Sequence, residues 1–179
     1  MADLAAFLGG LTASASEQWH WPGIDQHFDV VGYLTDREPP LELVVSVRAI
    51  ALRGDQVFVF ESEGETHAVP GGRREPGELP DAALTREIRE ETGCAIAGTP
   101  QRLGVLHLHS LTPRRHDPKY QYPYPDTIQW VFVADVIGDA APSDDPFVDN
   151  GRFVSFEEAR RSLHSVAERM LLDAAAASR

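Results

Sequence analysis

Three glutamates, Glu87, Glu90 and Glu91, are the residues whose types and spacing point most directly to chemistry. If residues 81–92 form a helix, side chains three and four positions apart share one patch, where like charges cost about 0.2–0.5 kcal/mol per pair. The glutamates also lie near the expected end of that helix, where the helix dipole favours cations. A hard divalent cation such as Mg²⁺, which takes oxygen ligands, would offset both costs. The cluster therefore predicts a metal site, and the alternative is an ordinary solvated acidic face.

The residues around these glutamates keep a fixed spacing. Glycines and charged residues occupy the positions Gly72, Glu78, Arg86, Glu87, Glu90, Glu91 and Gly93. Five residues separate the first two of these, and seven separate the second from the third. At every fixed polar and glycine position, this spacing resembles the signature of the Nudix hydrolases. Cys94 departs from the signature, which usually has an aliphatic residue there, but a buried free cysteine behaves as a small hydrophobe.

The resemblance implies a fold, a reaction and a cofactor. Nudix hydrolases share an α/β fold in which a mixed β-sheet is sandwiched between helices, an α/β/α sandwich. Their common reaction is the hydrolysis of a diphosphate (pyrophosphate) linkage joined to another moiety, often a nucleoside. The family resemblance implies Mg²⁺ or Mn²⁺ as the cofactor, and a diphosphate carries charge that such an ion would neutralise.

The metal ligands are also implied by the resemblance. Glu87, Glu90 and Glu91 would bind one or more ions, helped by a backbone carbonyl at Gly71 or Gly72. Paired glycines suit this role because they let the backbone approach a ligand closely.

The same resemblance implies catalytic roles. Arg86 would orient Glu87, and a base within reach of the attacking water would complete the reaction. Glu87 and Glu90 are the first choices for that base. An acid from residues 144–149, with Asp149 preferred, is the candidate outside the signature and could equally be an additional metal ligand.

Structural support is expected from three further positions. Glu78 would hold the loop and helix together, and Gly72 belongs to the glycine pair before the signature loop. Gly93 supplies the left-handed residue that ends many helices.

The substrate is left open between an unspecified nucleoside diphosphate derivative and a modified nucleoside triphosphate. A non-catalytic Nudix-fold nucleotide-binding or regulatory module is the alternative function, although such relatives often lose signature glutamates that this chain keeps. A diphosphate isomerase is disfavoured, because that chemistry calls for a cysteine outside the signature and the sequence contains only Cys94.

Composition narrows the function classes. The chain has 179 residues, a formal net charge of −12 and one cysteine, which cannot form an internal disulfide. The negative charge argues against a general nucleic-acid binder, because non-specific affinity comes largely from Lys and Arg. No apolar run approaches the roughly 20 residues that span a bilayer. Composition therefore predicts neither nucleic acid nor membrane as a partner and the cytoplasm as the compartment, and the resemblance implies a small-molecule diphosphate as the partner.

The chain divides into an N-terminal extension at residues 1–36 and a Nudix hydrolase domain at residues 37–179. The extension is expected to hold a short helix and a possible edge strand at residues 25–35. In the domain, residues 41–62 read as an antiparallel hairpin that turns at Gly54-Asp55. Strands are expected at residues 101–110, 127–137 and 152–154, followed by a helix over residues 156–177 that Ser155 caps.

Basic and aromatic residues supply candidates for substrate binding. Arg48 interrupts an otherwise apolar strand, which places it at an open face or in a cleft. Residues 111–126 gather Arg114, Arg115 and Tyr122 with several prolines. Arginine suits bidentate contact with phosphate, and tyrosine offers a stacking face.

Two further pairs have more than one interpretation. Trp19 and Trp21 are expected to anchor the N-terminal arm to the domain or to a second subunit, which leaves a homodimer possible; stacking on a base is the alternative. His107 and His109 share one face of the expected strand. Zinc is not expected there, because no third nitrogen or sulfur ligand has a matching spacing.

Overall fold

The computed structural model describes residues 4–21, 25–114, 122–143 and 148–179. The helices and strands follow one another along the chain in the order α1 (Leu4–Leu8), β1 (Ala15–Trp21), β2 (Gln26–Leu34), β3 (Val44–Arg53), β4 (Gln56–Ser62), β5 (Glu65–His67), β6 (Gly71–Arg73), α2 (Pro80–Thr92), β7 (Ala95–Ile96), β8 (Gln101–Ser110), β9 (Asp126–Ile137), β10 (Asp149–Ser155), α3 (Phe156–Ser162) and α4 (Val166–Ala177).

The strands form one mixed sheet in the order β1-β2-β8-β9-β3-β4-β10. The central strands β3 and β9 are parallel, and the other pairs along this path are antiparallel. The short strand β6 pairs with β3, so that Gly72 lies opposite Val47. The glycine loop that precedes α2 is thereby fixed against the middle of the sheet.

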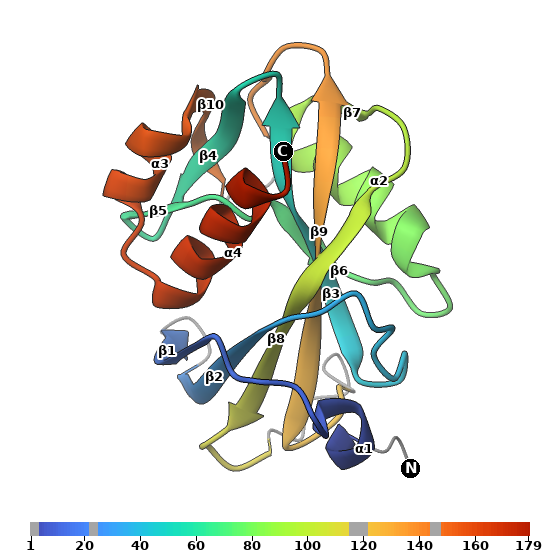
Figure 1. The fold of residues 1–179 in the computed structure, drawn as a ribbon. Coiled ribbons are helices and arrows are strands. Elements are labelled where there is room, and N and C mark those ends of the chain that lie inside the picture. The colour runs from blue at the N-terminus through green and yellow to red at the C-terminus, as the bar shows by residue number, and fades with distance from the viewer. Residues whose placement is uncertain (1–3, 22–24, 115–121, 144–147) are drawn as a thin grey trace.

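Helices cover both faces of the sheet, with α2 on one side and α3 and α4 on the other (Figure 1). Two apolar clusters hold these layers together. The first cluster includes Leu171 and Leu172 of α4, and the second includes Leu84 and Ile88 of α2 together with Phe7 of α1. The predicted α/β/α sandwich is confirmed.

Local sequence explains why α2 begins and ends where it does. Pro80 occupies the first turn, where its missing N–H costs nothing, and Asp81 suits the positive helix start. Leu84 and Ile88, four residues apart, are fully buried. Gly93 ends the helix with φ 75°, and its N–H donates to the carbonyl of Arg89. Cys94 is buried, which agrees with its interpretation as a small hydrophobic residue in place of the usual aliphatic one.

The N-terminal segment differs from the prediction in one respect. The short helix α1 is present, and residues 26–34 form strand β2. The expectation of an edge strand there is wrong, because β2 lies between β1 and β8 and pairs with both. Strand β1 takes the edge instead, since its alternating side chains place Trp19 and Trp21 against the core.

The C-terminal region also differs. The single helix predicted over residues 156–177 is two helices, separated at residues 163–165. Ser155 caps α3, as predicted, and Ser165 starts α4 by accepting a hydrogen bond from the N–H of Glu168. Glu17 of β1 accepts the N–H groups of Val166 and Ala167. These contacts satisfy the free donors at the start of α4, so the break costs little.

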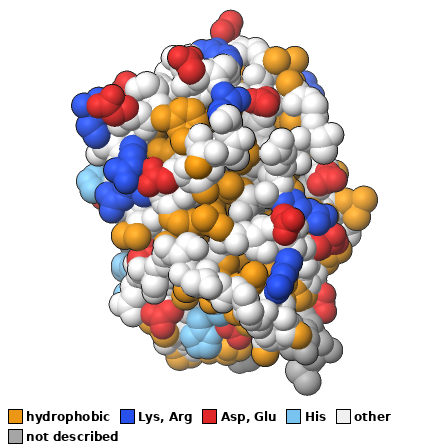
Figure 2. All heavy atoms as spheres, in the orientation of Figure 1, with side chains coloured by type: hydrophobic (Ala, Val, Ile, Leu, Met, Phe, Trp, Pro, Cys, Tyr) orange, Lys and Arg blue, Asp and Glu red, His pale blue; other side chains and the backbone are white. Residues whose placement is uncertain are grey.

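Charged groups of both signs are mixed on the surface. On the face shown in Figure 2, the basic side chains of the described residues lie beside acidic ones. Among the described residues, no helix is both long enough and apolar enough to cross a membrane.

The packing of α2 predicts a large cost for truncating Ile88, whose side chain is fully buried. The substitution Ile88→Ala should lower the free energy of unfolding by about 2–5 kcal/mol, because it opens a cavity between α2 and the sheet. Ile137→Ala is the matched control, since Ile137 is 61% exposed, and should change stability by less than about 1 kcal/mol. Urea denaturation of both variants measures this; equal losses would contradict the packing described here.

Candidate active site

Arg86 on α2 connects the acidic side chains. Its Nε and Nη2 donate to the two carboxylate oxygens of Glu78, at 3.0 and 2.9 Å. Its Nη1 donates to Glu87 at 2.7 Å and to Glu90 at 3.1 Å. Its Nη2 also reaches the carbonyl of Arg73, which belongs to the loop before the helix. One guanidinium therefore holds three carboxylates and the loop in one arrangement.

These contacts change the ionisation of the acids. The hydrogen bonds from Arg86 lower the pKa of Glu78 to about 2. In Glu87 burial has the opposite effect and raises the pKa of the carboxyl above its ordinary value, although Arg86 partly offsets this. Glu78 is thus a permanent anion, whereas Glu87 is a carboxylate that a nearby cation would stabilise.

The glycine pair lies directly beneath the acids. The N–H of Gly71 donates to Oε2 of Glu91 at 2.7 Å. Gly71 has φ 137°, and a Cβ there would lie 2.3 Å from the carbonyl oxygen of Val47. A Cβ at Gly72 would lie 2.5 Å from a carboxylate oxygen of Glu87. Both glycines are needed, because any side chain would displace the sheet or the acid.

A cleft of about 1020 Å³ opens beside this loop. Glu87 and Glu91 line it and are only 8% and 6% exposed as residues. Glu90 is not among the lining residues; its side chain is 53% exposed and points to the shared guanidinium. The acids thus divide into two in the cleft wall and one at the surface.

Three of the four residues predicted to bind substrate line the cleft. Arg48 does so while donating to Gln129 and to the carbonyl of Val69, at 2.9 and 3.0 Å. Arg114 and Tyr122 also line it, and the ring of Tyr122 lies 5.3 Å from the guanidinium carbon of Arg73. Arg115 lies outside the described residues.

Asp149 does not share the cleft wall with Glu87 and Glu91. It is exposed at the start of β10, opposite Glu61 of β4, and it is not among the residues that line the cleft. Its neighbour Val148 does line the cleft. Asp144 and Asp145 lie outside the described residues.

A sequence model of the NUDIX domain matches residues 42–174 of this chain. The chain belongs to the Nudix family. The assignment made from the signature is confirmed, and the match covers most of the chain.

Known proteins agree with this Nudix assignment. An 8-oxo-dGTP diphosphatase of Escherichia coli K12 is 28% identical over 90 residues, which are 48% of this chain and 58% of that protein. The chain therefore spans a little over half the length of this relative.

Among solved structures, a pyrophosphohydrolase from Bacillus subtilis, in an E68A mutant, superposes with a TM-score of 0.57 at 16% identity, covering 90% of this chain and 97% of that one. A NUDIX hydrolase from Nitrosomonas europaea gives the same TM-score at 20% identity, covering 75% and 89%. At these identities the superpositions show the Nudix fold alone.

The Nudix signature residues fit a hard divalent cation in chemistry and charge. Glu78, Glu87 and Glu90 contact one guanidinium, and Glu91 lies beside them in the cleft wall, so negative charge is in excess. Carboxylate and carbonyl oxygens are the donors that Mg²⁺ takes. Among the described residues, the three glutamates do not bring one oxygen each within 4.8 Å of one another. Glu87 and Glu90 accept hydrogen bonds from Arg86, and Glu91 accepts one from the N–H of Gly71, so the three carboxylates are held apart. A bound cation would draw their oxygens together.

The structure shows the neighbours of the tryptophan pair and the histidine pair, for which the sequence allowed more than one interpretation. Trp19 and Trp21 pack against the core and also line the cleft, so they anchor the N-terminal arm to the domain. His107 and His109 do share a face, as predicted. Both lie 2.8 Å from the same oxygen of Asp126, which makes them partners of a carboxylate.

A pair in the cleft wall, half-buried His67 and buried Glu168, was not anticipated. His67 Nδ1 lies 2.7 Å from Oε1 of Glu168, and the N–H of Ala68 donates to the other oxygen at 2.8 Å. Burial alone would lower the pKa of His67, yet the hydrogen bond and charge of Glu168 raise it above the ordinary 6.5. Both residues line the cleft. The sequence does carry a sign of this pair, because Glu168 lies on the apolar face of the last helix, two residues before Met170 and three before Leu171.

This pair predicts a pH-dependent stability. Because the folded pKa of His67 is raised, its stabilisation is complete below about pH 6.5 and is lost as the pH rises through the folded pKa. Glu168→Gln should therefore destabilise the protein more at pH 5.5 than at pH 9, measured as the free energy of unfolding in urea. Glu157→Gln, at an exposed position on α3, should show no such difference. A loss independent of pH would contradict the ionic pairing.

Proposed function

We propose that this Nudix protein hydrolyses a diphosphate linkage in a nucleoside diphosphate derivative or a modified nucleoside triphosphate, with Mg²⁺ or Mn²⁺ as cofactor. The observation that carries the proposal is the complete signature folded against a cleft. Glu87 and Glu91 form part of the cleft wall, and Arg48 and Arg114 face the same space. Acids for a cation and arginines for phosphate thus meet in one cavity.

Each signature residue takes a role that its contacts support. Glu87, Glu90 and Glu91, with a carbonyl at Gly71 or Gly72, would hold the cation. When bound, such an ion neutralises phosphate charge and acidifies water. Arg86 positions Glu87 through a 2.7 Å hydrogen bond. Glu78 in turn accepts hydrogen bonds from two nitrogens of Arg86, so Arg86 cannot move away from Glu87 without breaking its hydrogen bonds to Glu78.

Glu87 is the better candidate for the general base. It lines the cleft, whereas Glu90 is exposed outside it. The position of Asp149, exposed and away from the lining residues, gives it no support in this role.

The rest of the cleft suits a nucleoside. Aromatic side chains of Trp19, Trp21 and Tyr122 line it, and such rings offer faces for a base. Ser46 is 4% exposed and lines the cleft, and its hydroxyl has no hydrogen-bond partner among the described residues. A buried hydroxyl of this kind favours a polar ligand atom. One relative is named an 8-oxo-dGTP diphosphatase, and one similar structure is named a pyrophosphohydrolase. Nucleotides are therefore the first compounds to test.

The deciding experiment compares catalysis with simple binding. The full chain is incubated with Mg²⁺ and a panel of nucleoside diphosphate derivatives and nucleoside triphosphates, and released phosphate, diphosphate and nucleoside monophosphate are measured. Turnover of at least one compound, abolished by a chelator and restored by Mg²⁺, is expected. Binding of a nucleotide without cleavage of any compound would instead favour the non-catalytic binding module.

Removing one acid should abolish most of this turnover. Glu90→Gln should lower kcat/KM by about 100-fold or more, the scale seen when one group that stabilises transition-state charge is removed. The matched control is Glu157→Gln, because both glutamates are exposed on helices and pair with an arginine four residues away. Unchanged kcat/KM in Glu90→Gln would contradict its role as a ligand.

The cleft arginine should affect substrate binding. Arg114→Ala should raise KM about tenfold, because a charge-assisted hydrogen bond to phosphate contributes roughly 1.5 kcal/mol or more. Arg161→Ala on α3, with a side chain 73% exposed, is the control and should leave KM unchanged. The idea fails if both variants behave alike in steady-state kinetics on the same substrate.

A further inference from the structure

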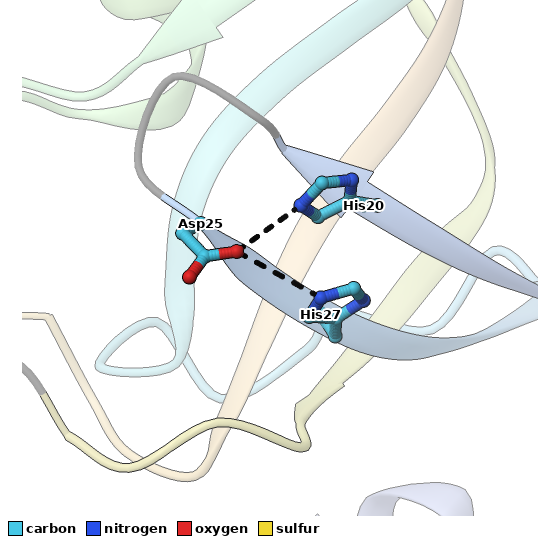
Figure 3. Close-up of side chains that lie close together, drawn as sticks. All are labelled: His20, Asp25 and His27. Atoms are coloured by element: carbon cyan, nitrogen blue, oxygen red, sulfur yellow. Dashed lines mark hydrogen bonds and ion pairs between the residues drawn. The ribbon is translucent and has the colours of Figure 1, made fainter.

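A second group of metal-binding side chains lies on the hairpin of β1 and β2. Among the described residues, His20, Asp25 and His27 form the one group of three His, Cys, Asp or Glu side chains whose ligand atoms all lie within 4.8 Å of one another. Figure 3 shows the carboxylate of Asp25 facing both imidazole rings. Nothing in the proposed hydrolysis uses these residues.

The sheet register brings the two histidines together. His20 of β1 and His27 of β2 are directly paired across the antiparallel ladder. Residues opposite each other in such a ladder project from the same face. Their rings stack with centroids 4.2 Å apart and planes 8° apart. Asp25, with φ 47°, lies just before β2 and turns its carboxylate toward the rings.

One of the two distances from Asp25 already matches the ligand spacing of a tetrahedral ion, and the other is about 0.6 Å longer. Oδ1 of Asp25 lies 3.4 Å from Nε2 of His20 and 4.0 Å from Nε2 of His27, long for hydrogen bonds. With metal–ligand bonds of about 2.0–2.1 Å, neighbouring ligands of a tetrahedral ion lie roughly 3.3–3.4 Å apart. The side chains of His20, His27 and Asp25 are 46%, 51% and 91% exposed, so each has open space in which to rotate toward a shared ion.

We propose that His20, Asp25 and His27 form a binding site for a transition-metal ion of the Zn²⁺ class. Two imidazoles and one carboxylate are donors that suit zinc, whereas the all-oxygen signature site suits Mg²⁺ or Mn²⁺. The fourth position of the tetrahedron faces solvent and takes water. The two sites therefore have different metal preferences and can be separated by experiment.

The site has a consequence for the cleft, because it joins β2 to β1, the strand that carries Trp19 and Trp21. Those tryptophans occupy the alternate positions of β1 and line the cleft, as does His20 itself. An ion bound by both strands holds the hairpin closed at its end. It stabilises the folded protein by mass action, since the unfolded chain does not bring these ligands together.

Zinc titration of the tag-free, metal-stripped chain tests the proposal. Calorimetry is performed in excess Mg²⁺, so that the signature site is already supplied. One Zn²⁺ per chain is expected for the wild type. His20→Ala and His27→Ala should each weaken binding more than tenfold, since even residues that only support a metal ligand cost about 10–100-fold. His164→Ala, at a histidine 80% exposed beside Glu65, is the matched control and should bind as the wild type does.

Two further measurements keep the outcome clear. Without metal, the histidine variants should melt at the wild-type temperature, because these side chains are exposed. Zn²⁺ should then raise the melting temperature of the wild type and of Glu90→Gln, but not of His27→Ala. The proposal is overturned if the wild type binds no Zn²⁺, or if His27→Ala binds it as tightly as the wild type does.

Discussion

The contact between Arg86 and its carboxylates is the constraint on which the rest of the site depends. Carboxylates three and four residues apart on a helix repel one another, and burial of Glu87 and Glu91 in the cleft wall strengthens that repulsion. A guanidinium that contacts Glu78, Glu87 and Glu90 together removes much of this repulsion. The remaining negative charge is what a divalent cation would neutralise.

This constraint explains why the loop before α2 contains glycines. Glu87 and Glu91 line the cleft with their carboxylates directly beside the backbone of β6. Gly71 donates its N–H to Glu91, and Gly72 leaves the space that the carboxylate of Glu87 occupies. Strand β6 is itself paired with β3, so the loop is held by the sheet. The loop is therefore tied both to the helix and to the sheet.

The opposite wall of the cleft is built by parts of the chain far from the signature. Glu17 of β1 caps the start of α4, and Glu168 of α4 holds His67 beside the glycine loop. The carboxylate of Glu168, which is only 2% exposed, is tolerated in the interior because each of its oxygens accepts a hydrogen bond. The N-terminal hairpin thus forms part of the cleft wall, although the family match begins only at residue 42.

The sequence by itself determined the signature helix, its acids and its glycines, because residues within about 20 positions are linked by helical periodicity and by the steric freedom of glycine. It also determined the family and hence the fold. Only the tertiary structure decided that β1, not β2, is the edge strand, that the last helix is broken at residues 163–165, and that Asp149 is not among the residues lining the cleft. It alone paired His67 with Glu168 and His20 with His27. Such contacts depend on sheet register and on packing between distant segments, and no local pattern of residues specifies either.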